Sequence, residues 1–169
     1  MAHWVAQRRA SLALAALMLT LAFVTGSLLR GPRLALRPKV GTGLDAFIET
    51  HNYFSPITSV LFASGPFELL IAMAALVVLV GAAERLMGWW RTLLAFVVTA
   101  YVGAAMGMLL QAAGLLAREI WAVRIEELTV FDPFTAISGT LLTASAFAGP
   151  LWRRRVRVLG FATLTIVFL

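Results

Sequence analysis

Four long, charge-poor stretches constrain the fold of this chain more than any other feature of its sequence. They cover approximately residues 10–29, 64–82, 92–117 and 134–151. A helix needs about 20 mainly apolar residues to cross the hydrocarbon core of a bilayer. Soluble domains are about 25% charged, whereas this chain is 13% charged and 61% hydrophobic. The sequence therefore predicts an all-α polytopic membrane protein, with a single membrane domain over residues 1–169.

A fifth apolar segment, residues 158–169, ends after 12 residues. At 1.5 Å per residue it covers about 18 Å, which is too short for a span. We therefore expect four full spans and an incomplete fifth, in a longer protein whose C-terminal region or partner helices complete the domain.

The first stretch is unlike a cleaved signal peptide, because its apolar run exceeds the usual length of about 7–15 residues and no A-x-A-like site follows.

Lysine and arginine positions set the expected orientation, because cytoplasmic loops carry an excess of both. With five alternating segments, the N-terminus and the second and fourth loops share one side, which holds 8 of the 14 Lys and Arg residues. We expect that side to be cytoplasmic, the protein to lie in the plasma membrane, and the loop of residues 30–63 to lie outside. The net charge of +6 then needs no nucleic-acid partner.

The densest basic cluster directly follows the fourth stretch and comprises Trp152, Arg153, Arg154, Arg155 and Arg157. A tryptophan beside arginines is typical of the membrane interface. Each basic residue near an anionic leaflet contributes about 1 kcal/mol of attraction. The cluster is therefore a topology signal and a candidate contact for lipid headgroups, with membrane lipids as the expected partners.

Two prolines predict where helices begin, because proline favours the first helical position. Pro66 opens one helix and Pro133 opens another, which Asp132 would cap. Glu68 would then be the third residue of its helix, where a carboxylate caps the N-terminus and interacts favourably with the helix dipole. Ser138 would lie roughly 9 Å along the second helix from Asp132.

Ser138 is a candidate nucleophile, and helix packing is the competing interpretation. Small residues recur every four positions around it, at Ala136, Thr140, Ala144 and Ala148. Such a ridge lets helices approach closely. A serine nucleophile also needs a base within hydrogen-bond reach, and His51 is the one histidine expected on the same side of the membrane. Periodicity favours packing for Ser138.

Several classes of site are excluded by composition. The chain has no cysteine, and this rules out thiolate metal sites and a cysteine nucleophile. It has two histidines, His3 and His51. Neither phosphate-binding glycine motif occurs, and the histidines lack metal-ligand spacing. We therefore expect no metal and no cofactor.

The loop Arg118–Pro133 carries both positive and negative residues around Trp121. This pattern predicts a short interfacial helix.

Three short motifs follow one another along the chain. They comprise Thr58 to Phe62, then Glu84, Arg85, Gly88 and Arg91, and finally Ser138 with Gly139. Their order resembles the rhomboid family of intramembrane serine proteases, whose members carry T-S-x-F, E-R-x-x-G-x-x-R and G-x-S-G motifs. The resemblance extends over roughly Phe54 to Leu151. It implies a rhomboid-like helical bundle with Ser138 in the position of the nucleophile.

Departures from the family pattern imply that the chain is not a working protease. Glu68 and Ala72 stand where the family has a histidine and an asparagine that support the oxyanion, and Ala136 replaces a glycine. The family's general-base histidine lies on a sixth span, which this sequence does not reach. Losing a base or an oxyanion donor reduces rates by orders of magnitude. We expect a non-proteolytic, rhomboid-like module; the alternative is a fragment of an active rhomboid protease.

A second set of residues carries a narrower resemblance: Phe54, Pro56 to Ser59, Phe62 to Gly65, and Trp152 to Arg155. They are similar to the N-terminal membrane region of some bacterial lysylphosphatidylglycerol synthetase-like proteins, in which a soluble aminoacyl-transferring domain follows. This resemblance implies a membrane anchor or lipid-associated region of a phosphatidylglycerol lysyltransferase in the bacterial inner membrane. The arginine cluster would then contact an anionic phospholipid.

Overall fold

The computed structural model describes residues 8–28, 31–33, 36–43, 47, 51–124 and 130–168. Within these ranges the regular secondary structure is helical, and extended pairing is limited to an isolated bridge between Thr42 and Val130. Two of the described helices are long and apolar enough to cross a membrane, Pro66–Met87 with 22 residues and Trp89–Leu116 with 28. The chain is thus all-helical with two candidate spans, and four full spans remain a prediction.

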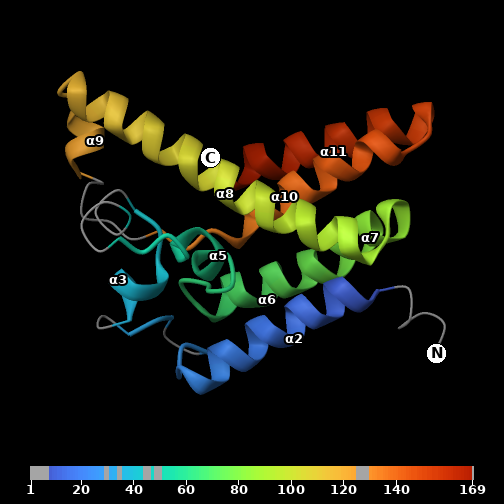
Figure 1. Ribbon diagram of the computed structural model, residues 1–169, viewed down its shortest axis with the longest axis horizontal. Coiled ribbons are helices and arrows are strands. Elements are labelled where there is room, and N and C mark those ends of the chain that lie inside the picture. The colour runs from blue at the N-terminus through green and yellow to red at the C-terminus, as the bar shows by residue number, and fades with distance from the viewer. Residues whose placement is uncertain are drawn as a thin grey trace.

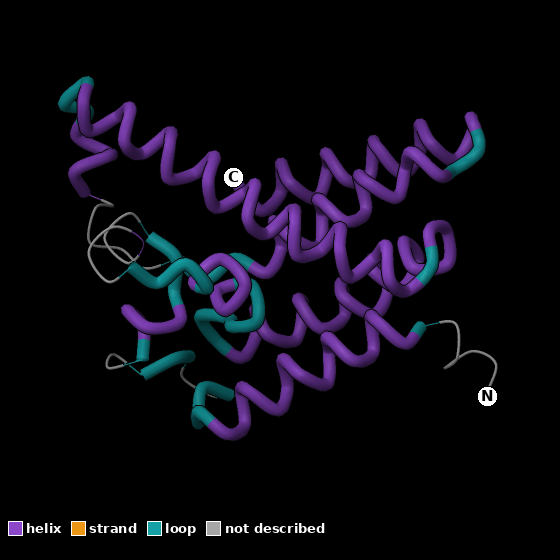
Figure 2. The backbone as a smooth tube through the Cα atoms, viewed as in Figure 1, coloured by secondary structure: helices purple, strands orange, loops and turns teal. Residues whose placement is uncertain are grey.

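The long helices lie side by side as a bundle (Figures 1 and 2). The short helices of residues 37–40, 55–59 and 120–124 lie toward the left in this view, and the short helix of residues 81–87 lies at the right. In chain order the elements are α2 (Arg9–Val24), α3 (Arg37–Val40), α5 (Ser55–Ser59), α6 (Pro66–Ala75), the π-helical η1 (Leu76–Val80), α7 (Gly81–Met87), α8 (Trp89–Leu116), α9 (Ile120–Arg124), α10 (Pro133–Ala144), the 3-10 turn η2 (Ser145–Phe147) and α11 (Pro150–Phe168). Helix α10 packs against α8 and α11, and α2 packs against η1.

Both predicted helix starts are confirmed. Pro66 is the first residue of α6, and Pro133 is the first residue of α10. The Asp132 carboxylate accepts the backbone N–H groups of Phe134 at 2.9 Å and of Thr135 at 3.2 Å. These bonds satisfy donors that have no partner inside the helix. Local chemistry therefore fixes where α10 begins.

Three of the predicted stretches differ in their bounds from the helices of the structure. The stretch expected to span residues 10–29 forms a helix of 16 residues, α2, which ends at Val24 ahead of Gly26 at a φ of 67°. The fourth predicted span, residues 134–151, is divided among the 12-residue α10, the turn η2 and the first two residues of α11. The fifth apolar segment, residues 158–169, belongs to a longer helix, α11, which starts at Pro150 and has 19 residues.

The break after η2 has a physical cause in the pair Gly149–Pro150. Proline cannot continue a preceding helix but suits the first turn of a new one. Arginine is a good helix former, so Arg153 to Arg157 continue the helix that Pro150 begins. The basic cluster, which we expected in a loop, therefore occupies the first turns of α11.

Helices α8 and α10 approach closely through small residues. Ala136, Thr140 and Ala144 are fully buried on α10. A Cβ added at Gly139 would lie 2.6 Å from the Thr99 Cβ on α8, and the Thr99 hydroxyl donates to the Ala136 carbonyl at 3.3 Å. Three of the four predicted ridge residues, Ala136, Thr140 and Ala144, therefore lie on this packing surface, whereas Ala148 follows η2 and lies outside α10.

The start of α2 is joined to η1 and α7 by polar groups. The buried carboxylate of Glu84 accepts the backbone N–H groups of Ala10 at 2.8 Å and Ser11 at 3.0 Å. The Arg8 guanidinium donates to the Val77 carbonyl at 2.9 Å. Glu84 therefore caps a helix that lies more than 70 residues away in the sequence.

Candidate functional site

Ser138 lies in the interior of α10 and its side chain is fully buried. Its Oγ is a buried atom without a hydrogen-bond partner among the described residues. The next residue, Gly139, leaves no room between α10 and Thr99 of α8. The hydroxyl is therefore enclosed by packing rather than presented to a substrate.

His51 does not activate Ser138 in this structure. Its side chain is exposed, and its ring lies edge-on to Tyr53 with centroids 6.3 Å apart. Since the Ser138 Oγ has no partner in the described part of the chain, the His51–Ser138 dyad is not formed. His3 lies outside the described residues. The structure thus supplies no histidine within hydrogen-bond reach of the candidate nucleophile from the residues it describes.

Glu68 and Ala72, both on α6, have structural environments. The Glu68 Oε2 accepts the backbone N–H of Ser64 at 2.9 Å, just before α6 begins. Ala72 is fully buried and shares one apolar cluster with Ala136 and Ile137. Glu68 therefore stabilises a helix start, and Ala72 is part of the apolar core.

The Glu84–Arg91 motif forms the turn between α7 and α8. Gly88 has a φ of 82°, a conformation that glycine adopts without strain. The Arg91 guanidinium carbon lies 5.5 Å from the centroid of the Phe147 ring, within range of a cation–π interaction. Together with the Glu84 cap, these contacts connect α2, α7, α8 and η2. Each described contact of this motif is structural.

The earlier Thr58–Phe62 motif is also structural. The Thr58 hydroxyl donates to the Val40 carbonyl at 3.0 Å. The Thr42 hydroxyl lies 2.8 Å from both the Ser55 carbonyl oxygen and the Ser59 Oγ. These bonds hold α5 against the segment that follows α3. The motif therefore organises the loop end of the bundle.

The arginine cluster is exposed at the start of α11. The side chains of Arg153, Arg154, Arg155 and Arg157 are all exposed. Arg153 donates to the Ala146 carbonyl and Arg157 to the Ser145 Oγ, each at 3.4 Å. The side chain of Trp152 lies outside the described part of the structure. The guanidinium groups can therefore meet headgroups, provided that this end faces an anionic leaflet.

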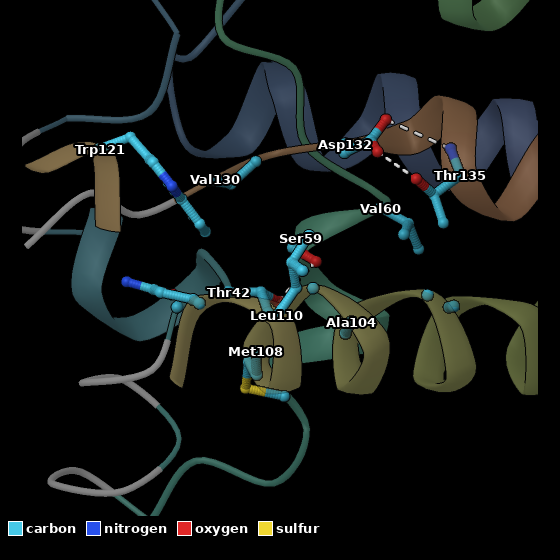
Figure 3. A pocket seen from close by; sticks show the side chains of 15 residues that line it. Thr42, Ser59, Val60, Ala104, Met108, Leu110, Trp121, Val130, Asp132 and Thr135 are labelled. Atoms are coloured by element: carbon cyan, nitrogen blue, oxygen red, sulfur yellow. Dashed lines mark hydrogen bonds between the residues drawn. The ribbon is translucent and has the colours of Figure 1, made fainter. Parts of the chain in front are cut away.

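Sequence reasoning missed a cavity of about 370 Å³ beside the second half of α8. Figure 3 shows it between α8, α9, the residues around α5 and the start of α10. It is lined by Thr42, Gly43, Ser59, Val60, Ala100, Gly103, Ala104, Gly107, Met108, Leu110, Gln111, Trp121, Val130, Asp132 and Thr135. The one available signal was the pair Gly103 and Gly107 on α8, whose four-residue spacing is equally typical of helix packing.

The described residues bring together no group of three or more His, Cys, Asp or Glu side chains that could hold a metal ion. Comparison with protein families, with curated proteins and with solved structures gives no match. The rhomboid-like and synthetase-like resemblances therefore rest on the sequence motifs alone.

Proposed function

We infer that this chain is a rhomboid-like membrane module without proteolytic activity, and that it serves as the membrane anchor or lipid-associated region of a larger protein such as a phosphatidylglycerol lysyltransferase. The observation that carries the non-proteolytic part is the enclosed Ser138 hydroxyl, which has no partner among the described residues. A serine nucleophile requires a base in hydrogen-bond contact and an oxyanion site beside it. Ser138 has the environment of a packing residue.

The outer surface of the long helices supports the membrane part of the proposal. Leu109 and Leu110 on α8 are each 65% exposed, and Phe67 and Leu70 on α6 are exposed as well. A water-soluble protein rarely leaves so much apolar surface uncovered. Lipid hydrocarbon would cover these side chains in a bilayer.

The exposed arginines at the start of α11 support association with anionic lipid. Four guanidinium groups near a negatively charged leaflet would contribute about 1 kcal/mol each. This end of the bundle also carries the start of α2 and the α7–α8 turn (Figure 1). We propose that it faces the cytoplasm.

Labelling with a fluorophosphonate probe tests the proposal. We expect no attachment to Ser138 in the purified chain, and no difference between the wild type and Ser138→Ala. A known serine hydrolase added to the same sample verifies that the probe is reactive. Attachment at Ser138 that disappears in Ser138→Ala would support the alternative, a fragment of a rhomboid protease, and His51 would then be the base to replace.

A further inference from the structure

We propose that the cavity beside α8 binds one acyl chain of a membrane lipid. The inference rests on the proposed membrane location of the chain and adds a defined binding site to it. The cavity volume of about 370 Å³ lies within the range of about 300–1,000 Å³ that is usual for small-molecule sites. Its lining residues on α8 belong to the second half of that helix, whereas the arginine cluster lies at the start of α11, at the other end of the bundle (Figure 1).

The walls of the cavity favour hydrocarbon over a polar ligand. The Thr42 and Ser59 hydroxyls lie 2.8 Å from each other and so satisfy one another. The Asp132 carboxylate accepts two backbone N–H groups and the Thr135 hydroxyl. These four polar side chains are thus engaged within the protein, and a polar ligand group would have to compete with those bonds. An acyl chain loses no hydrogen bonds and gains contacts with wall atoms that face empty space.

Exposed lining residues on α8 point to the membrane as the source of the ligand. Gly107 and Leu110 line the cavity, and both are exposed. They continue the apolar outer face that Met106 and Leu109 form on α8, a helix long enough to cross a membrane. A lipid chain lying against α8 can therefore enter the cavity without passing through water.

The two cavity glycines of α8 differ in what lies in front of them. A Cβ at Gly103 would collide with the Thr135 side chain, whereas a Cβ at Gly107 meets nothing within 4 Å. Because Gly107 lines the cavity, a larger side chain there narrows it, and no protein atom within 4 Å of the new Cβ has to move. Removing a helical glycine also stabilises the helix, so the variant should fold.

The experiment uses the purified chain in phosphatidylcholine vesicles that contain some lipid with a diazirine in the middle of one acyl chain. After irradiation, mass spectrometry locates the attached lipid. Val60 lines the cavity but is only 4% exposed, so lipid around the outside of the bundle cannot reach it. We expect attachment at Val60 in the wild type.

Gly107→Leu should abolish attachment at Val60, because the leucine fills the space. Ala105→Leu is the matched control, since Ala105 is an exposed residue of α8 that does not line the cavity. It should leave attachment at Val60 unchanged. Circular dichroism and thermal melting verify that both variants are folded.

Three results would overturn the inference. Attachment confined to the outer face of α8, or attachment at Val60 that survives Gly107→Leu, would show that no chain enters the cavity. A dimer that becomes monomeric in Gly107→Leu, measured by light scattering in detergent, would identify a second copy of the chain as the occupant.

Flotation with vesicles after an alkaline wash distinguishes a failure of the membrane proposal from a failure of the acyl-chain proposal. A chain that does not float contradicts the membrane module, whereas one that floats without attachment at Val60 contradicts the acyl-chain site alone.

Discussion

Replacing Glu84 with glutamine should lower the stability of the bundle, because this carboxylate caps α2 across more than 70 residues of sequence. Hydrogen bonds to a charged group contribute about 1.5–3 kcal/mol each, and a negative charge at a helix N-terminus adds about 0.3–1 kcal/mol. Glutamine keeps one acceptor oxygen but brings an NH₂ group to face the Ala10 and Ser11 amides. We expect a net loss of about 2 kcal/mol, from one weakened bond and the missing charge.

Thermal unfolding in detergent, followed by circular dichroism, measures this loss. A change of about 2 kcal/mol corresponds to a decrease in Tm of roughly 4–8 °C for a chain of this size. Glu119→Gln is the control, because Glu119 is exposed and surface substitutions usually change stability by less than about 0.5 kcal/mol. Hydrogen exchange should also become faster at the Ala10 and Ser11 amides. If Glu84→Gln has the same Tm as the Glu119→Gln control and its Ala10 and Ser11 amides still exchange slowly, Glu84 does not cap α2.

Three further predictions concern orientation, capping and close packing. Cysteine at Arg154 should resist a membrane-impermeant thiol reagent in intact cells while cysteine at Ser64 reacts; the reverse would overturn the proposed orientation. Glu68→Gln should lower stability by only about 1 kcal/mol, since one capping bond is weakened; thermal melting verifies this, and loss of folded protein would indicate a buried charge pair. Gly139→Ala should lower Tm, because the new Cβ would collide with Thr99 of α8. Gly149→Ala is the control and should leave Tm unchanged, because a Cβ there meets no atom within 4 Å. Equal melting temperatures for the two variants would contradict the close approach of α10 to α8.

Features encoded by neighbouring residues could be predicted from the sequence. Asp132 and Pro133 specify a helix start by themselves, and so does the proline of α6, because a cap depends only on the first turn. The same kind of signal was present at Gly149–Pro150 and separates α10 from α11. We missed it because the surrounding run is apolar throughout, and a span was expected to be continuous.

Features that join distant segments could not be predicted in this way. Nothing near Glu84 in the sequence indicates that its partners are the amides of Ala10 and Ser11. The cavity requires α5, α8, α9 and the start of α10 to be placed together (Figure 3). The two glycines on α8 carry the same spacing signal, yet Gly103 packs against Thr135 and Gly107 faces open space. Tertiary structure alone distinguishes them.

The central claim is that Ser138 is a packing residue, and the stability of Ser138→Ala tests it most directly. Ser138 and Ser59 are both buried serines, but the Ser59 hydroxyl is hydrogen-bonded while that of Ser138 has no partner among the described residues. A buried polar group without a partner costs about 1–3 kcal/mol, whereas a satisfied hydrogen bond stabilises by about 0.5–1.5 kcal/mol. Thermal melting should therefore give an equal or higher Tm for Ser138→Ala and a lower Tm for Ser59→Ala. A Tm that falls in Ser138→Ala as far as in Ser59→Ala would show that the Ser138 hydroxyl is engaged, and would contradict the account.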